Sequence, residues 1–249
     1  MRQHSLHIAL LISLLSCQSK RPEGTSSTTD STAGATSAGF SAAEMPGPSP
    51  DNFLIIPGLQ VGPIDTTATE ASLIALLGAE NVVRDTVYVI EGTYEIGTTL
   101  YKNTADQAHI LWKDKSRFAR PESVLIRPAR DQDNRLLPGT AGPVSQWITD
   151  TGVKPGSTLR EVEKQNGRAF TLYGFDWDYG GQSTSWKGGL LAGKNQKATI
   201  SVGFSPPESM TDNQQKNYEQ VVGDREFSSD SRAMHQLNPT VHTLTLFFK

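Results

Sequence analysis

The chain has 249 residues, a hydrophobic fraction of 36% and a formal net charge of -3 at pH 7. There is no basic excess and no stripe of lysine and arginine with interleaved aromatic residues, so nucleic acid is not an expected partner. The single cysteine, Cys17, excludes a disulfide within the chain.

The first 16 residues have the pattern of a secretory signal peptide. Arg2 is followed by an apolar run from Leu6 to Leu15 and then by Ser16 and Cys17. Because a helix needs about 20 apolar residues to cross a bilayer, this run is too short for a permanent membrane span. We therefore expect cleavage rather than a transmembrane anchor.

Leu14, Leu15, Ser16 and Cys17 resemble the lipobox of bacterial lipoproteins. The resemblance implies thioether lipidation of Cys17, cleavage before it and acylation of the new amino group. Several acyl chains would give stable membrane attachment, whereas one chain gives only marginal binding. Gln18, rather than aspartate, follows the cysteine, which by analogy with enterobacterial sorting favours the outer membrane and leaves open the periplasmic or surface face. The alternative is a cysteine that ends an ordinary signal peptide.

Residues 17–52 are rich in Ser, Thr, Gly, Ala and Pro, with almost no large apolar side chains. Such a segment buries too little surface to offset its ordering entropy, which predicts a disordered tether. The remaining stretch of about 200 residues is long enough for one domain or two small ones.

A first helix-plus-sheet copy is predicted over 53–130. Phe53 to Gly58 reads as a short strand that ends at Pro-Gly. Thr67 and Glu70 have capping-box spacing and begin a helix over 68–77 that Gly78 ends. Four β-rich stretches follow, separated by turn residues, at 83–90, 94–101, 108–113 and 122–127.

A polar, Gly/Pro-rich linker is predicted at 131–146, and a second copy over 147–249. Thr158 and Glu161 form its capping box, and Asn166 and Gly167 end its helix. Strands are expected near 169–175, 182–187, 198–204 and 241–248. The fold class is therefore α+β, as two divergent copies of a short helix packed on an antiparallel β-meander.

The segment GVKPGSTLREVEKQNG, at 152–167, resembles the helix opening of a group of small repeat domains. This group includes the β-lactamase inhibitory protein and the small lipoprotein of the outer-membrane barrel-assembly machine. The resemblance implies a helical segment packed on an antiparallel sheet, and it carries no inhibitor contact residue. The wider stretch, with GFDWDYGG and QLNPTVHTLTLFF, is similar to bacterial lipoproteins to which no function is assigned.

The strongest candidate for a binding site is Trp177-Asp178-Tyr179, which precedes Gly180-Gly181, with Trp186 close behind. Alternation on a strand would place Trp177 and Tyr179 on one face and Asp178 in solvent. One interpretation is an ordinary hairpin whose aromatic side chains fill the core. The other is a platform for sugar rings or for the apolar surface of a partner.

No metal site and no cofactor are expected. His109, His235 and His242 each stand alone in their segments, without HExxH or paired spacing. Asp131 and Asp133 begin like a calcium loop, but Arg135 occupies the third ligand position.

Three further groups of residues are weaker candidates for a functional site. Asp224, Glu226 and Asp230 could bind a cation, although a solvated acidic loop is the simpler interpretation. Ser157 is better explained as part of a helix start than as a nucleophile, since no GxSxG motif is present. Glu91 and Glu95 flank a hairpin glycine and could form an acid/base pair.

These features favour a membrane-anchored cell-envelope lipoprotein with a non-catalytic binding or structural domain. An envelope protein or glycan is the expected partner, besides the membrane itself. The alternatives are an envelope glycan hydrolase that uses unrecognised carboxylates, and a binding module for a small apolar ligand.

Overall fold

The computed structural model describes residues 47–129, 145–193 and 199–248, which belong to one compact unit. Residues 1–46, with the predicted signal peptide, Cys17 and most of the tether, lie outside this part, as do Asp131, Asp133, Arg135 and most of the predicted linker. Among the described residues, no helix has the length and apolar character needed to cross a membrane.

The fold is α+β with mostly antiparallel sheets, as predicted. The first part contains β1 (Leu54–Ile56), β2 (Gln60–Val61), β3 (Ile64–Asp65), α1 (Glu70–Leu77), a short 3-10 helix (Ala79–Asn81), β4 (Val82–Tyr88), β5 (Tyr94–Leu100), β6 (Ala108–Asp114) and β7 (Ala119–Ile126). The second part contains β8 (Ile148–Thr149), α2 (Leu159–Asn166), β9 (Thr171–Tyr173), β10 (Ser183–Ser185), a 3-10 helix (Leu190–Ala192), β11 (Ile200–Ser205), α3 (Asp212–Tyr218), β12 (Glu226–Ser228), α4 (Arg232–Leu237) and β13 (Thr240–Phe247).

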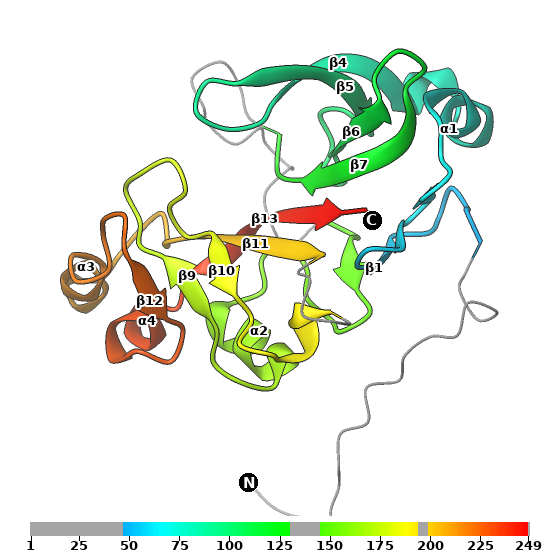
Figure 1. The fold of residues 1–249 in the computed structure, drawn as a ribbon. Coiled ribbons are helices and arrows are strands. Elements are labelled where there is room, and N and C mark those ends of the chain that lie inside the picture. Colours follow the sequence, from blue (N-terminus) through cyan, green and yellow to red (C-terminus); the bar gives the residue numbers. More distant parts are fainter. Residues whose placement is uncertain (1–46, 130–144, 194–198, 249) are drawn as a thin grey trace, which may run out of the picture. The chain divides into compact units, whose positions relative to one another are not determined.

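The strands form three sheets within the described residues. The largest has six strands in the order β11-β13-β7-β6-β5-β4, the second has four in the order β3-β2-β1-β8, and the third has three in the order β10-β9-β12. In Figure 1, β4 to β7 form the upper part, while β9, β10, β12, α3 and α4 lie together at the left. The small sheet therefore lies beside α3 and α4.

β13 joins the two stretches that the sequence predicts as separate copies. It pairs with β7 through Leu244↔Ile126 and with β11 through Val202↔Leu244, both antiparallel. One cluster of buried apolar side chains extends from Ile55 to Phe248. The two stretches thus share a sheet and a core, and the idea that they are divergent copies stays a prediction about their origin.

α1 begins later than the capping-box spacing predicted. The N-cap is Thr69, whose side chain accepts from the Ser72 amide while Ser72 Oγ accepts from the Thr69 amide. The Thr67–Glu70 box is therefore wrong. Backbone bonds from Glu70 N to Phe118 O and from Arg120 N to Ala68 O hold the preceding residues against the start of β7.

The Glu70 side chain instead binds two residues of the six-stranded sheet. Its carboxylate accepts a hydrogen bond from Thr98 Oγ1 at 2.7 Å and pairs with Arg84 at 2.5 Å. Trp112 Nε1 in turn donates to Thr98 Oγ1 at 2.9 Å. Burial tends to raise the pKa of Glu70, but the bonds from Arg84 and Thr98 outweigh it and lower that pKa.

α2 agrees closely with the sequence. The Thr158–Glu161 capping box is present, and Gly167 ends the helix in the left-handed conformation with φ 77°. Leu159 and Val162 are buried. The sequence interpretation missed α3 and α4, although Thr211 and Gln214 form a third capping box.

Candidate functional site

The small sheet has an outer face on which one aromatic and one acidic side chain lie opposite each other. β12 pairs antiparallel with β9, and the register places Glu226 opposite Tyr173. Residues opposite each other in this way project from the same face. Their neighbours Leu172 and Phe227 project from the other face, where Leu172 is fully buried.

The loop over 174–182 connects β9 to β10 and is closed by its own backbone. Gly180 N donates to Trp177 O at 2.9 Å, and Gln182 N donates to Tyr179 O at 3.1 Å. Gly181 has φ 75°, and a Cβ there would lie 2.1 Å from Phe204 O, so the close approach to β11 requires glycine.

The far side of this loop is held from α3. Asp176 adopts a positive φ of 65°, and its carboxylate accepts a hydrogen bond from the Tyr218 hydroxyl. Burial, together with this bond, raises the pKa of Tyr218 to about 12. The Tyr218 ring also stacks on Phe175 with centroids 5.8 Å apart. These contacts fix the loop and therefore the side chains on it.

The loop brings Trp177 and Tyr179 onto Tyr173, and we call these three side chains the aromatic surface. The ring centroids of Tyr173 and Trp177 are 5.0 Å apart with an interplanar angle of 81°, and those of Trp177 and Tyr179 are 5.2 Å apart at 51°. All three residues are half-buried. Trp177 Nε1 donates to Gly174 O at 3.0 Å, so its polar edge is satisfied.

The alternation predicted for Trp177 and Tyr179 is wrong, because both lie in the loop between β9 and β10 rather than in a strand. They meet through the fold of the loop and fill no core position. Asp178 is exposed, as predicted. Trp186 is buried, with an exposed fraction of 4%, and its Nε1 donates to Ile200 O, so it cannot contribute to a binding surface.

Carboxylates surround the aromatic surface. The hydrogen-bonding carboxylate of Glu91, in the β4–β5 turn, raises the pKa of Tyr179. Asp178 is exposed within the loop, and Glu226 is exposed beside Tyr173. Glu95 pairs with Lys115 at 2.5 Å, so Glu91 and Glu95 have different partners and do not form the acid/base pair considered above.

Glu226 belongs to β12, which corrects its predicted place in an acidic loop. Asp224 and Asp230 are exposed, and Asp230 accepts a hydrogen bond from Ser228 at 2.5 Å. No group of three or more His, Cys, Asp or Glu side chains among the described residues could hold a metal ion.

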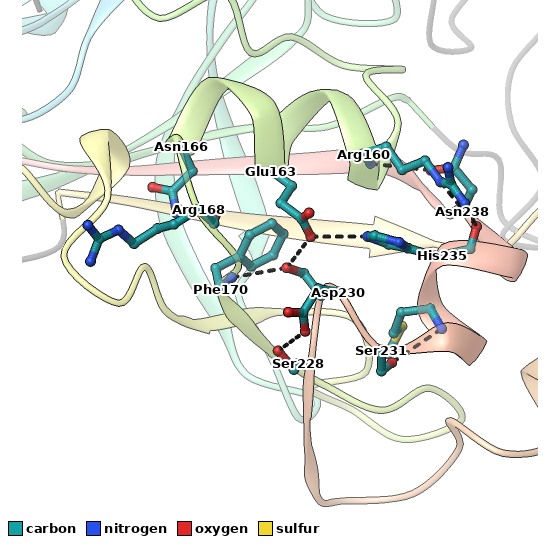
Figure 2. Close-up of polar contacts among 12 residues, drawn as sticks. Arg160, Glu163, Asn166, Arg168, Phe170, Ser228, Asp230, Ser231, His235 and Asn238 are labelled. Carbon is teal, nitrogen blue, oxygen red and sulfur yellow. Dashed lines mark hydrogen bonds and ion pairs between the residues drawn. The ribbon is translucent and has the colours of Figure 1, made fainter. Parts of the chain in front are cut away.

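A second polar cluster joins α2 to α4, and Figure 2 shows Glu163 facing His235 across that joint. Glu163 Oε2 accepts from Ser229 Oγ at 2.7 Å and lies 3.3 Å from His235 Nε2. Ser229 Oγ also accepts from Phe170 N at 3.0 Å. Arg160 donates from Nε and Nη2 to His235 O.

This cluster has the residue types of a hydrolytic triad but not its geometry. In a triad, histidine lies between the nucleophile and the carboxylate. Here Glu163 lies between Ser229 and His235, and the Ser229 hydroxyl, fully buried, donates to the carboxylate. The cluster therefore positions α2 against α4 and offers no activated nucleophile.

The other predicted positions have structural partners. His109 is buried between Thr99 and Gln107, and His242 is half-buried in β13. Ser157 lies just before α2, as expected, and accepts from Lys154 N. A hollow of about 220 Å³ beside the start of α1 has one lining carboxylate, Asp65, which accepts hydrogen bonds from Thr67.

Sequence reasoning missed Tyr173 as a member of the site, and it grouped Glu226 with Asp224 and Asp230 rather than with the aromatic side chains. Strand alternation over residues 170–173 does predict that the Tyr173 side chain projects from the opposite face of the sheet to those of Phe170 and Leu172. The pairing of β9 with β12 joins residues more than fifty positions apart, and no local pattern specifies it.

No protein-family model, curated protein or solved structure matches this chain significantly.

Proposed function

We propose that this protein is a lipid-anchored cell-envelope protein whose folded unit binds a macromolecular partner without catalysis. The anchor is the predicted lipidation of Cys17, and the contact site is the aromatic surface. Its partly exposed rings lie on β9 and on the following loop, which backbone hydrogen bonds and the Asp176–Tyr218 bond hold in place, and this observation carries the proposal.

Three physical properties support a binding role for the aromatic surface. Aromatic residues provide large contact area with few rotatable bonds, which is why they dominate binding energy at interfaces. The loop is already ordered by Gly181 and by the Asp176–Tyr218 bond, so little conformational entropy is lost on binding. The carboxylates nearby would orient a polar partner.

We favour binding over the hydrolase alternative because the carboxylates that could act together have other partners. Glu95 is paired with Lys115, and Glu163 is bound by Ser229 and His235. A retaining or inverting glycosidase needs two carboxyl groups facing one another across the scissile bond.

The test is in-cell crosslinking of the full chain in its native envelope, followed by identification of the captured protein or glycan. We expect Trp177→Ala and Tyr179→Ala, alone and together, to reduce capture at least about tenfold, because truncating an aromatic hot spot costs about 2 kcal/mol or more. Leu59→Ala, which changes a 48% exposed apolar residue elsewhere, is the matched control.

The anchor is tested in the same cells. Cys17→Ser should move the chain from the membrane fraction to the soluble fraction and abolish labelling by a fatty-acid analogue. Capture that is equal in the aromatic variants and the wild type would refute the site. A Cys17→Ser chain that stays in the membrane fraction would refute the anchor.

A further inference from the structure

In the described part of the chain, the charged side chains that border the aromatic surface are acidic. The Glu91 carboxylate is near enough to raise the pKa of Tyr179, Asp178 lies between the two loop aromatics in sequence, and Glu226 lies opposite Tyr173. Glu91, Asp178 and Glu226 are all exposed, so their charges face solvent. A ligand on this surface meets aromatic ring faces bordered by negative charge.

Three arginine side chains that could neutralise these carboxylates have contacts elsewhere. Arg225 precedes Glu226, but its guanidinium lies 4.7 Å over the ring of Phe227, on the opposite face of the sheet. Arg127 donates to the carbonyl of Tyr88 at the base of the β4–β5 turn. Arg168 precedes β9, at the end of the strand away from Tyr173, and donates to Lys187 O.

Ring faces bordered by carboxylates attract cations. The negative face of an aromatic ring binds ammonium and guanidinium groups, most strongly when the ring is that of tryptophan. Carboxylates nearby add complementary charge, which raises the association rate and rejects acidic partners. This complementarity distinguishes a cationic ligand from a neutral sugar, which would gain nothing from the charge.

We propose that the aromatic surface binds a cationic segment of a partner protein, with an arginine or lysine side chain lying on Trp177 and its charge facing Asp178 and Glu226. This inference rests on the proposed function and adds the chemical class of the partner to it. The guanidinium group of arginine fits best, because it can stack on a ring and donate to carboxylates together.

The tryptophan distribution makes the local charge measurable without a partner. Of the 4 tryptophans, Trp112, Trp147 and Trp186 are buried, at 1%, 0% and 4% exposure, which leaves Trp177 accessible to ionic quenchers. The first experiment measures fluorescence quenching of the detergent-solubilised full chain by caesium and by iodide. Each constant is normalised to the quenching of N-acetyltryptophanamide by the same ion.

We expect normalised quenching by caesium to exceed that by iodide about twofold or more, since a cation is concentrated near these carboxylates. The combined Asp178→Asn and Glu226→Gln variant should bring the ratio close to unity, and Trp177→Phe should remove most of the quenchable emission. The matched control is Glu122→Gln, an exposed carboxylate of β7 in the six-stranded sheet. A ratio at or below unity in the wild type would overturn the proposal.

The second experiment measures binding of a fluorescent peptide of alternating arginine and serine, with a glutamate–serine peptide and a chitin oligosaccharide as competitors. We expect the basic peptide alone to bind, about threefold more weakly in Asp178→Asn or Glu226→Gln and about tenfold more weakly in Trp177→Ala. Glu122→Gln should bind as the wild type does. Circular dichroism of each variant identifies any loss of fold.

Binding of the oligosaccharide in place of the basic peptide would overturn the cationic assignment. So would basic-peptide binding that is unchanged in Trp177→Ala and in the carboxylate variants. In either case, envelope capture that still depends on Trp177 and Tyr179 would leave the proposed function standing. Capture that is independent of these residues would refute the proposed function itself.

Discussion

His109 shows how a residue that suggests chemistry can be entirely structural. Its Nδ1 lies 2.9 Å from Thr99 Oγ1, which also lies 3.1 Å from Asp85 Oδ2, and its Nε2 lies 3.2 Å from Gln107 Nε2. A Gln107 amide that donates to Nε2 leaves the imidazole proton on Nδ1, pointing at Thr99. A second proton on Nε2 would face that donor, so the neutral ring fits the site.

Burial of His109 makes the free energy of unfolding depend on pH. Desolvation, together with the charge of Arg127, lowers the pKa of His109 from 6.5 to about 4. Above pH 6.5 the ring is neutral in both the folded and the unfolded states. As the pH falls from 6.5 toward 4, His109 binds a proton in the unfolded chain but stays neutral in the folded protein. The free energy of unfolding therefore decreases over this interval.

We therefore expect the wild type to lose about 3 kcal/mol more than His109→Gln between neutral pH and pH 4. Urea unfolding of both proteins across this range, followed by circular dichroism, measures the difference at each pH. Glutamine retains a donor and an acceptor but does not titrate. A stability difference between the two proteins that stays constant with pH would contradict this account.

The elements show where local patterns suffice and where they fail. The capping box of α2 uses Thr158 and Glu161 as their spacing predicted, and the Glu161 carboxylate accepts from both the amide and the hydroxyl of Thr158. At α1 the same spacing misled, because Glu70 is bound by Thr98 and Arg84 of the sheet. A capping rule based on local spacing does not include hydrogen-bond partners from other elements.

The position of the α1 cap gives a direct test. Thr69→Ala should destabilise the protein by about 1 kcal/mol, because it removes the side-chain acceptor for the Ser72 amide. Thr67→Ala, the matched control, changes an exposed residue outside the helix whose hydroxyl donates to Asp65 within the turn, and should cost less. Chemical denaturation measures the free energy of unfolding of both variants. A larger loss in Thr67→Ala than in Thr69→Ala would support the capping box predicted at Thr67.

At the scale of the whole described unit, β13 is the connection on which the fold depends. Leu244 is fully buried and its strand pairs with β7 on one side and β11 on the other. A strand that completes a shared sheet transmits instability to both neighbours. The described unit should therefore unfold as one cooperative transition rather than as two.

Leu244→Ala should lower the free energy of unfolding by about 2–5 kcal/mol through loss of apolar contacts and formation of a cavity. The entire transition should shift, as monitored both by tryptophan fluorescence and by far-UV circular dichroism. Phe247→Ala, on the same strand but 43% exposed, should shift it much less. Two separate transitions, of which only one responds to Leu244→Ala, would mean that the two stretches fold independently.

Elements whose signals are local could be predicted from the amino-acid sequence. β4 to β7, α2, β11 and β13 lie within a few residues of their predicted bounds, because turn residues, caps and apolar periodicity act between neighbours in the chain. The α+β class followed from their order. The predictions for the amino terminus also depend only on local pattern, and they concern residues outside the described part.

The burial of each aromatic side chain and the partners of each carboxylate depend on contacts between distant segments, which local patterns do not specify. Trp177 and Trp186 are nine positions apart in the sequence. Trp186 is buried against Phe170 and Ile200. Trp177, by contrast, is half-buried and packs on Tyr173. Burial depends on which strands come to lie opposite a side chain. These pairings join segments far apart in the chain, and their specificity comes from the whole packed core rather than from any one stretch.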